Sequence, residues 1–134
     1  GGNMENKTIQ HYLTSSTHAY AIVDGNYNPV HDLNELNNVI ENMLIDSHTM
    51  PALGVSIHAE ILQAVQHGVW IKLQYPQPCE VDGMQFDELL IEVNSEFGGF
   101  NIVRGNKGIY DGRCFYINLD KDMHQLSDWI NQKF

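Results

Sequence analysis

Segment 110–116, which reads YDGRCFY, is the part of the sequence whose residue types come nearest to a catalytic pattern. A nucleophilic cysteine needs a lowered pKa and a neighbouring base, and Arg113 could supply positive charge beside Cys114. Neighbouring residues of a strand point to opposite faces, however, and no histidine lies close in the sequence to act as the base. The favoured interpretation is an Asp111-Gly112 turn followed by a core strand in which Cys114 is buried.

Metal binding is the next chemistry that the residue types suggest, because seven histidines are many for 134 residues. A helix that binds zinc carries two histidines four residues apart, or a histidine close to a cysteine. The sequence contains neither spacing. We therefore expect scattered surface histidines and no metal.

Acid–base catalysis is a possible role for Glu88 and Glu92, which share one face of an expected strand. Carboxylates in this pattern more often form the solvated face of a half-buried antiparallel strand. The phosphate-binding glycine motifs and the G-x-S-x-G motif of hydrolases are both absent from the sequence. We accordingly expect no catalytic residues and no cofactor, and an enzyme is the third choice among the functions considered.

The basic residues are concentrated near the C-terminus. Between residues 8 and 103 the sequence has one basic residue, Lys72, and twelve acidic ones, whereas residues 104–134 have five basic and four acidic residues. Arg104, Lys107 and Arg113 could together hold a phosphate or a carboxylate. The favoured alternative is a solvated turn whose cations pair with nearby acids.

The whole chain is strongly acidic, with 17 Asp and Glu, 7 Lys and Arg, a net charge of −10 and a pI near 4.9. This charge excludes binding of nucleic acid or an anionic membrane through overall charge. An acidic face could instead dock on a basic protein, such as a nucleic-acid-binding protein, a toxin or a nuclease. The alternative is that the acidic surface only keeps the protein soluble.

The elements that must position these residues follow from the spacing of the apolar residues. Periods of three to four residues predict helices, and alternation predicts strands, with turns expected at 24–26, 105–108 and 111–112. The predicted helices are 5–14, 32–47, 57–67 and a last one that begins at Asp120. The predicted strands are 19–23, a short 27–30 weakened by Pro29, 69–75 ended by Pro76 and Pro78, 86–94, 100–104 and 113–119.

Successive strands joined by short turns predict an antiparallel meander, because parallel neighbours need long crossovers. The expected fold class is therefore α+β, with two layers: a sheet of about four to five strands and helices packed on one face. Residues 4–134 are expected to form one domain, and residues 1–3 resemble a remnant of an expression vector. The order of elements is similar to that of small profilin-like or PAS-like sensory domains, but no residue motif supports the similarity.

The location expected for the protein is the cytoplasm. No stretch has the roughly 18 apolar residues of a membrane helix, and the N-terminus lacks a signal-peptide pattern. Two cysteines, Cys79 and Cys114, are too few for a disulfide scaffold, so we expect reduced thiols, and a bridge between them is the less favoured alternative.

Trp70, Phe86 and Tyr116 are expected on a sheet face that no helix covers. Such an aromatic surface would serve partner binding, self-association as a homodimer, or a small ligand. The leading hypothesis is a non-catalytic module that binds a protein partner through the acidic helices or this sheet face. The alternative is a small-molecule-binding or sensory domain with a pocket between the sheet and the helices.

Overall fold

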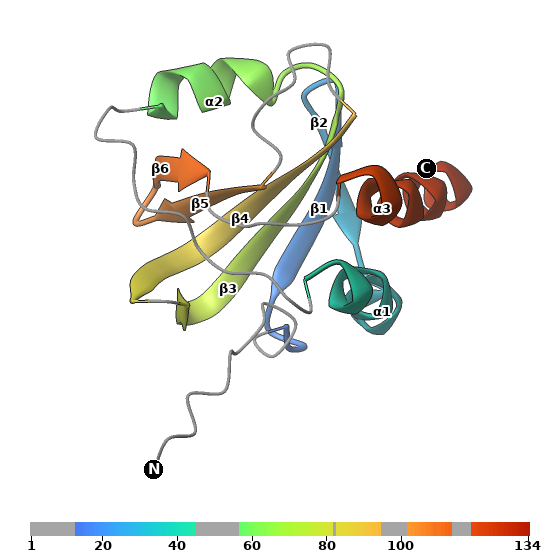
Figure 1. The fold of residues 1–134 in the computed structure, drawn as a ribbon, viewed down its shortest axis with the longest axis horizontal. Coiled ribbons are helices and arrows are strands. Elements are labelled where there is room, and N and C mark those ends of the chain that lie inside the picture. The colour runs from blue at the N-terminus through green and yellow to red at the C-terminus, as the bar shows by residue number, and fades with distance from the viewer. Residues whose placement is uncertain (1–12, 45–56, 82, 95–101, 114–118) are drawn as a thin grey trace.

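One antiparallel sheet organises the part of the chain that the computed structural model describes, which is residues 13–44, 57–81, 83–94, 102–113 and 119–134 (Figure 1). The strands lie in the order β2-β1-β3-β4-β5-β6, so β2 and β6 are the two edges. The elements are β1 (His18–Val23), β2 (Asn26–Val30), α1 (Leu33–Leu44), α2 (His58–Ala64), β3 (Val69–Val81), β4 (Met84–Asn94), β5 (Ile102–Asn106), β6 (Ile109–Arg113) and α3 (Leu119–Lys133).

Helices lie against both faces of this sheet (Figure 1). On one face, α1 and α3 pack over Ile71, Leu73 and Ile91. On the other face, α2 packs over Trp70 and Leu90. The central strands are apolar on both sides and therefore need two covers. The α+β class and the antiparallel sheet are confirmed, while the described sheet has six strands and α2 adds a cover on the face expected to be open.

Two of the hairpins close with two-residue loops that need left-handed backbone. Asp24 and Gly25 have φ values of 47° and 83°, and Lys107 and Gly108 have values of 52° and 82°. Positive φ at both positions defines the tight hairpin turn whose twist matches that of the strands. The expected turns at 24–26 and 105–108 are therefore confirmed at their central residues.

The turn expected at Asp111-Gly112 is wrong, because these residues lie inside β6. Gly105 pairs with Tyr110 and Arg104 pairs with Gly112, so Asp111 is an extra residue in the ladder. The Asp-Gly signal marks a β-bulge here, since the reversal of the chain is already made at Lys107 and Gly108.

Pro76 and Pro78 do not end the third strand, which continues to Val81. The register shifts between Gln74, which pairs with Glu88, and Cys79, which pairs with Phe86. Five steps along β3 therefore match two along β4, and both prolines lie in the excess. A bulge accommodates them because its residues are not required to donate ladder hydrogen bonds.

The remaining helices and strands match the predictions in their central residues and differ from them at their ends. The helix expected at 57–67 is confirmed by the burial of its apolar stripe and by the left-handed Gly68, with φ 74°. The last helix begins at Leu119, so the strand expected at 113–119 is wrong at that residue. Leu13 and Thr14 are not helical, whereas expectations for 5–12, 45–47, 98–101 and 114–118 fall outside the described residues. Over the described residues, no helix combines the length and apolar character needed to cross a membrane.

Candidate functional site: a polar cluster beside helix α2

Trp70 and Phe86 do not line an open surface, because both side chains are 0% exposed. Trp70 lies under α2 and its Nε1–H donates to the carbonyl of His67 at 2.9 Å. Phe86 packs edge-to-face on Tyr75 in the core shared with α1 and α3. The expectation that they are exposed is therefore wrong, since α2 covers Trp70 and the core under α1 and α3 encloses Phe86. Tyr116 lies outside the described residues.

The expected basic cluster does not form a shared anion site among the described side chains. Arg104 is 1% exposed, and its Nε–H donates to Asp111 Oδ1 at 2.9 Å. Lys107 is exposed, and its backbone N–H donates to the carboxylate of Asp87 at 3.2 Å. The side chain of Arg113 falls outside the described residues. The interpretation that this turn pairs with nearby acids is confirmed for Arg104.

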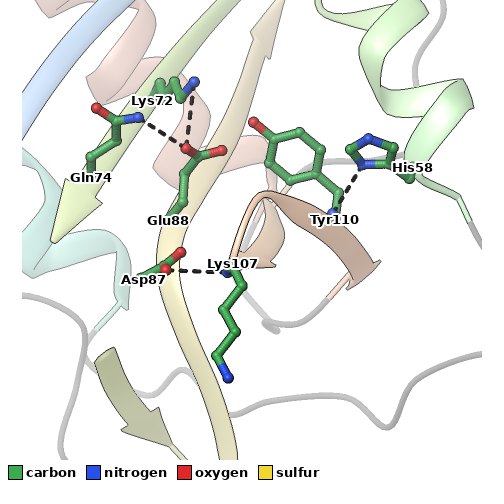
Figure 2. A network of polar contacts seen from close by, with 7 residues as sticks. All are labelled: His58, Lys72, Gln74, Asp87, Glu88, Lys107 and Tyr110. Atoms are coloured by element: carbon green, nitrogen blue, oxygen red, sulfur yellow. Dashed lines mark hydrogen bonds and ion pairs between the residues drawn. The ribbon is translucent and has the colours of Figure 1, made fainter. Parts of the chain in front are cut away.

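A different group of polar residues comes together on the α2 face, and we call it the Glu88 cluster (Figure 2). Its centre is the Glu88 carboxylate, which accepts a hydrogen bond from Gln74 Nε2 at 3.2 Å and lies 3.4 Å from Lys72 Nζ. The phenol of Tyr110 lies on the same side of the sheet, and Glu88 contributes, after burial, to raising the pKa of this phenol. His58 stacks on the far side of the Tyr110 ring. Four elements, β3, β4, β6 and α2, therefore meet at one point.

The register of the sheet explains why the strand residues of the cluster meet. Glu88 lies opposite Gln74 on β3 and opposite Gly105 on β5, and Gly105 in turn lies opposite Tyr110 on β6. Directly paired residues of neighbouring strands place their side chains on the same face. A Cβ atom on Gly105 would lie 2.9 Å from Tyr110 Cδ1, so only glycine lets the phenol ring cross β5 toward Glu88.

His58 accepts a hydrogen bond from the backbone N–H of Tyr110, with 3.2 Å between N and Nδ1. The two rings are stacked, with centroids 5.5 Å apart and planes at 25°. The two-residue loop at Lys107 and Gly108 makes Gly105 and Tyr110 a pair without ladder hydrogen bonds, so this N–H points away from the sheet. An imidazole that accepts at Nδ1 is neutral and carries its proton on Nε2.

The electrostatics of the Glu88 cluster favour binding over proton transfer. Burial and the neighbouring Glu88 carboxylate raise the pKa of the Tyr110 phenol above its ordinary value, so the phenol remains a neutral donor. A phenol with a raised pKa is a poor general acid near neutral pH. Lys72 is held by Glu88 and also lies 5.3 Å from the centre of the Tyr27 ring. The polar groups of the cluster therefore hold the strands and α2 together and are not arranged as reactive groups.

Cys79 is a free thiol with 1% exposure, in the core on the α1 and α3 side. Burial, and secondarily the charge of Asp87, raise the pKa of this thiol to about 12. A thiol with this pKa is almost entirely protonated near neutral pH and is a weak nucleophile. Cys114 lies outside the described residues. Within the described part of the chain, no group of three or more His, Cys, Asp or Glu side chains is arranged to hold a metal ion.

A cavity of about 520 Å³ opens at the start of α1. Its lining combines hydroxyl, amide and carboxylate groups with two leucines: Leu13, Thr14, Ser15, His31, Asp32, Leu33, Asn34, Glu35 and Asn37. The Asn37 Oδ1 atom is buried and has no hydrogen-bond partner among the described residues. This cavity lies beside the first turn of α1, and its polar groups are two carboxylates, which only accept hydrogen bonds, and hydroxyl, amide and imidazole groups, which can both donate and accept.

Comparison with protein families, curated proteins and solved structures finds no match to this chain. Its function is therefore inferred from its own charge distribution and from the geometry of the cluster, the cavity and the sheet edges.

Proposed function

We propose that the protein is a cytoplasmic, non-catalytic binding module whose partner is a basic protein. The observation that supports this proposal is how the cations are used within the fold. Lys72 pairs with Glu88, Arg104 pairs with Asp111, and Lys133 lies 3.2 Å from Asp32 and 3.0 Å from Glu35. Cations held in this way beside carboxylates do not form a positive patch, and the acidic excess of the chain remains.

An acidic surface of this kind attracts a positively charged protein and repels nucleic acid and anionic lipid. Association steered by charge is fast and weakens as salt screens the charges. Exposed carboxylates occur on both sides of the sheet, for example Glu60 on α2 and Asp128 on α3. Either face could therefore carry the interface, and a pair of variants distinguishes them.

The experiment is affinity capture from a lysate in about 50 mM and about 500 mM salt, with the captured proteins identified by mass spectrometry. The purified partner is then titrated against the wild type and against Glu60→Gln and Asp128→Asn by calorimetry. We expect a basic partner whose Kd rises with salt, and a further several-fold rise in one of the two variants. A captured partner that is acidic, or a Kd unaffected by salt, would contradict the proposal.

A second candidate function is binding of a small ligand in the cavity at the start of α1. The buried, unpartnered Asn37 Oδ1 supports it, because a ligand with a hydrogen-bond donor would satisfy this acceptor. A thermal-shift screen of small amines and polyols tests the idea, with Asn37→Leu as the binding-deficient variant and the exposed Asn131→Leu as the matched control. A ligand that stabilises both variants equally would place binding elsewhere.

A further inference from the structure

We propose that His58 is a pH-dependent latch, which holds the start of α2 on the edge strand β6 and releases it when the imidazole is protonated. The contact joins residues 52 positions apart in the sequence, the first residue of α2 and the second residue of β6. Its donor is the outward-facing N–H of Tyr110, so His58 occupies the place that another strand would take.

Protonation reverses the chemistry of this contact. The neutral imidazole accepts the Tyr110 N–H at Nδ1, whereas the imidazolium carries a hydrogen on both ring nitrogens and can only donate. Taking up one proton from solvent therefore brings two donors face to face, and the hydrogen bond is lost. Histidine is the side chain whose ordinary change of charge falls between about pH 5 and 8.

The groups around the contact leave His58 as the group that changes charge. On β6, Tyr110 stays neutral because burial and Glu88 raise the pKa of its phenol. On β4, Glu88 is paired with Lys72 of β3, and Asp87 accepts the backbone N–H of Lys107. Glu60 lies two residues along α2 and is exposed. Among the described residues, the Tyr110 N–H bonds to His58 and to none of these carboxylates, so they do not replace the acceptor that protonation removes.

Release of the latch is local, because the rest of α2 has its own anchors. Ile61 is 0% exposed and Ala64 is 3% exposed, and both pack in the apolar cluster over Trp70. These residues keep the helix on the sheet after the His58 contact is lost. The expected change is a loosened first turn of α2 and a backbone donor on β6 that becomes accessible to water or to a pairing strand.

Amide hydrogen exchange by NMR tests the latch at the atom that it concerns. The protection factor of the Tyr110 amide, corrected for the intrinsic exchange rate, is measured for the wild type at about pH 8 and about pH 5. We expect it to fall roughly tenfold at the lower pH, as loss of one net hydrogen bond implies. The Leu90 amide in the central strand β4 is the internal reference and should keep its protection.

Two variants separate the acceptor from the ring. His58→Asn places an acceptor that does not titrate, Oδ1, at the position of Nδ1, so the protection of Tyr110 should no longer depend on pH. His58→Phe keeps a ring that can stack on Tyr110 but has no acceptor, so protection should be low at both pH values. The ring ¹⁵N signals of wild-type His58 provide a measurement that does not depend on either variant.

Three results would overturn the proposal. The first is equal protection of the wild-type Tyr110 amide at both pH values. The second is a fall in protection whose midpoint differs from the titration of the His58 ring. The third is a His58→Phe variant whose Tyr110 amide is as well protected as in the wild type at about pH 8.

Discussion

The two edges of the sheet are closed by different devices. On β2, Tyr27 and Pro29 occupy the positions that face away from β1, and proline has no N–H to offer to another strand. On β6, the outward N–H of Tyr110 exists and is occupied by His58. The missing donor at Pro29 belongs to the covalent structure and is permanent, whereas the contact at Tyr110 depends on one side chain. Of these two devices, only the one at Tyr110 can be reversed by a change in conditions.

The largest expected effect on stability at the β6 edge comes from a substitution at Gly105, on which the Tyr110 ring packs. In Gly105→Ala the new Cβ lies 2.9 Å from Tyr110 Cδ1, and the ring must leave β5. Because the Glu88 and His58 contacts both depend on Tyr110, we expect the free energy of unfolding to fall by about 1–3 kcal/mol in urea denaturation. The control is Gly105→Ala on a Tyr110→Ala background, where the clash is absent. An equal loss on both backgrounds would contradict the role of the ring.

Removal of the His58 side chain is the next smaller effect. His58→Ala deletes one hydrogen bond and one stacked ring, and should lower the free energy of unfolding by about 1 kcal/mol near pH 8. The proposed latch predicts that the difference between the two proteins shrinks at acidic pH, because an imidazolium cannot accept the Tyr110 N–H. Urea titrations at both pH values measure it, and a difference that does not change with pH would contradict the latch.

Alkaline pH should also weaken the β6 edge, through Tyr110. The pKa of its phenol is raised in the folded protein, so the stabilisation is complete below the ordinary tyrosine pKa of about 10 and is lost as pH rises above it. The Cys79 thiol, whose pKa is raised from 9.0 to about 12, likewise stabilises the folded protein below about pH 9 and loses this contribution as pH rises toward 12. Unfolding of Cys79→Ala from pH 8 to 11 removes the contribution of the cysteine and leaves those of Tyr110 and of Lys133, whose pKa is also raised by Glu35 and Asp32. Adding Tyr110→Phe should reduce the remaining slope, and an unchanged slope would contradict this assignment.

Local signals in the sequence predicted much of the fold around these edges. The Asp24-Gly25 turn, the left-handed Gly68 and the apolar stripe of α2 each depend on residues within one or two turns of chain, so their patterns are readable directly. Pro29 likewise weakened the prediction for 27–30, and its strand is an edge.

The candidate site could not be predicted in the same way, because it depends on long-range pairing. Alternation places Lys72 and Gln74 on one face, but the position of Glu88 beside them depends on the β3–β4 register, whose bulge holds two prolines. The error at Trp70 has the same origin, since its burial depends on which face α2 covers. His58 had no local signal at all, because its partner lies 52 residues away.

The smallest effect on stability is expected at the β2 edge, where Pro29→Ala restores a backbone N–H that faces solvent. Pro29 is exposed, so the free energy of unfolding should change by less than about 0.5 kcal/mol. Self-association should respond instead, because β2 then presents a donor beside the exposed Tyr27, which is 48% exposed. Sedimentation velocity measures it, with the exposed Asn131→Ala on α3 as control. The contrary result is a Pro29→Ala variant that stays as monodisperse as the control at every pH while His58→Phe associates. It would show that the proline is not what keeps β2 from pairing, and that only the β6 edge requires protection by a side chain.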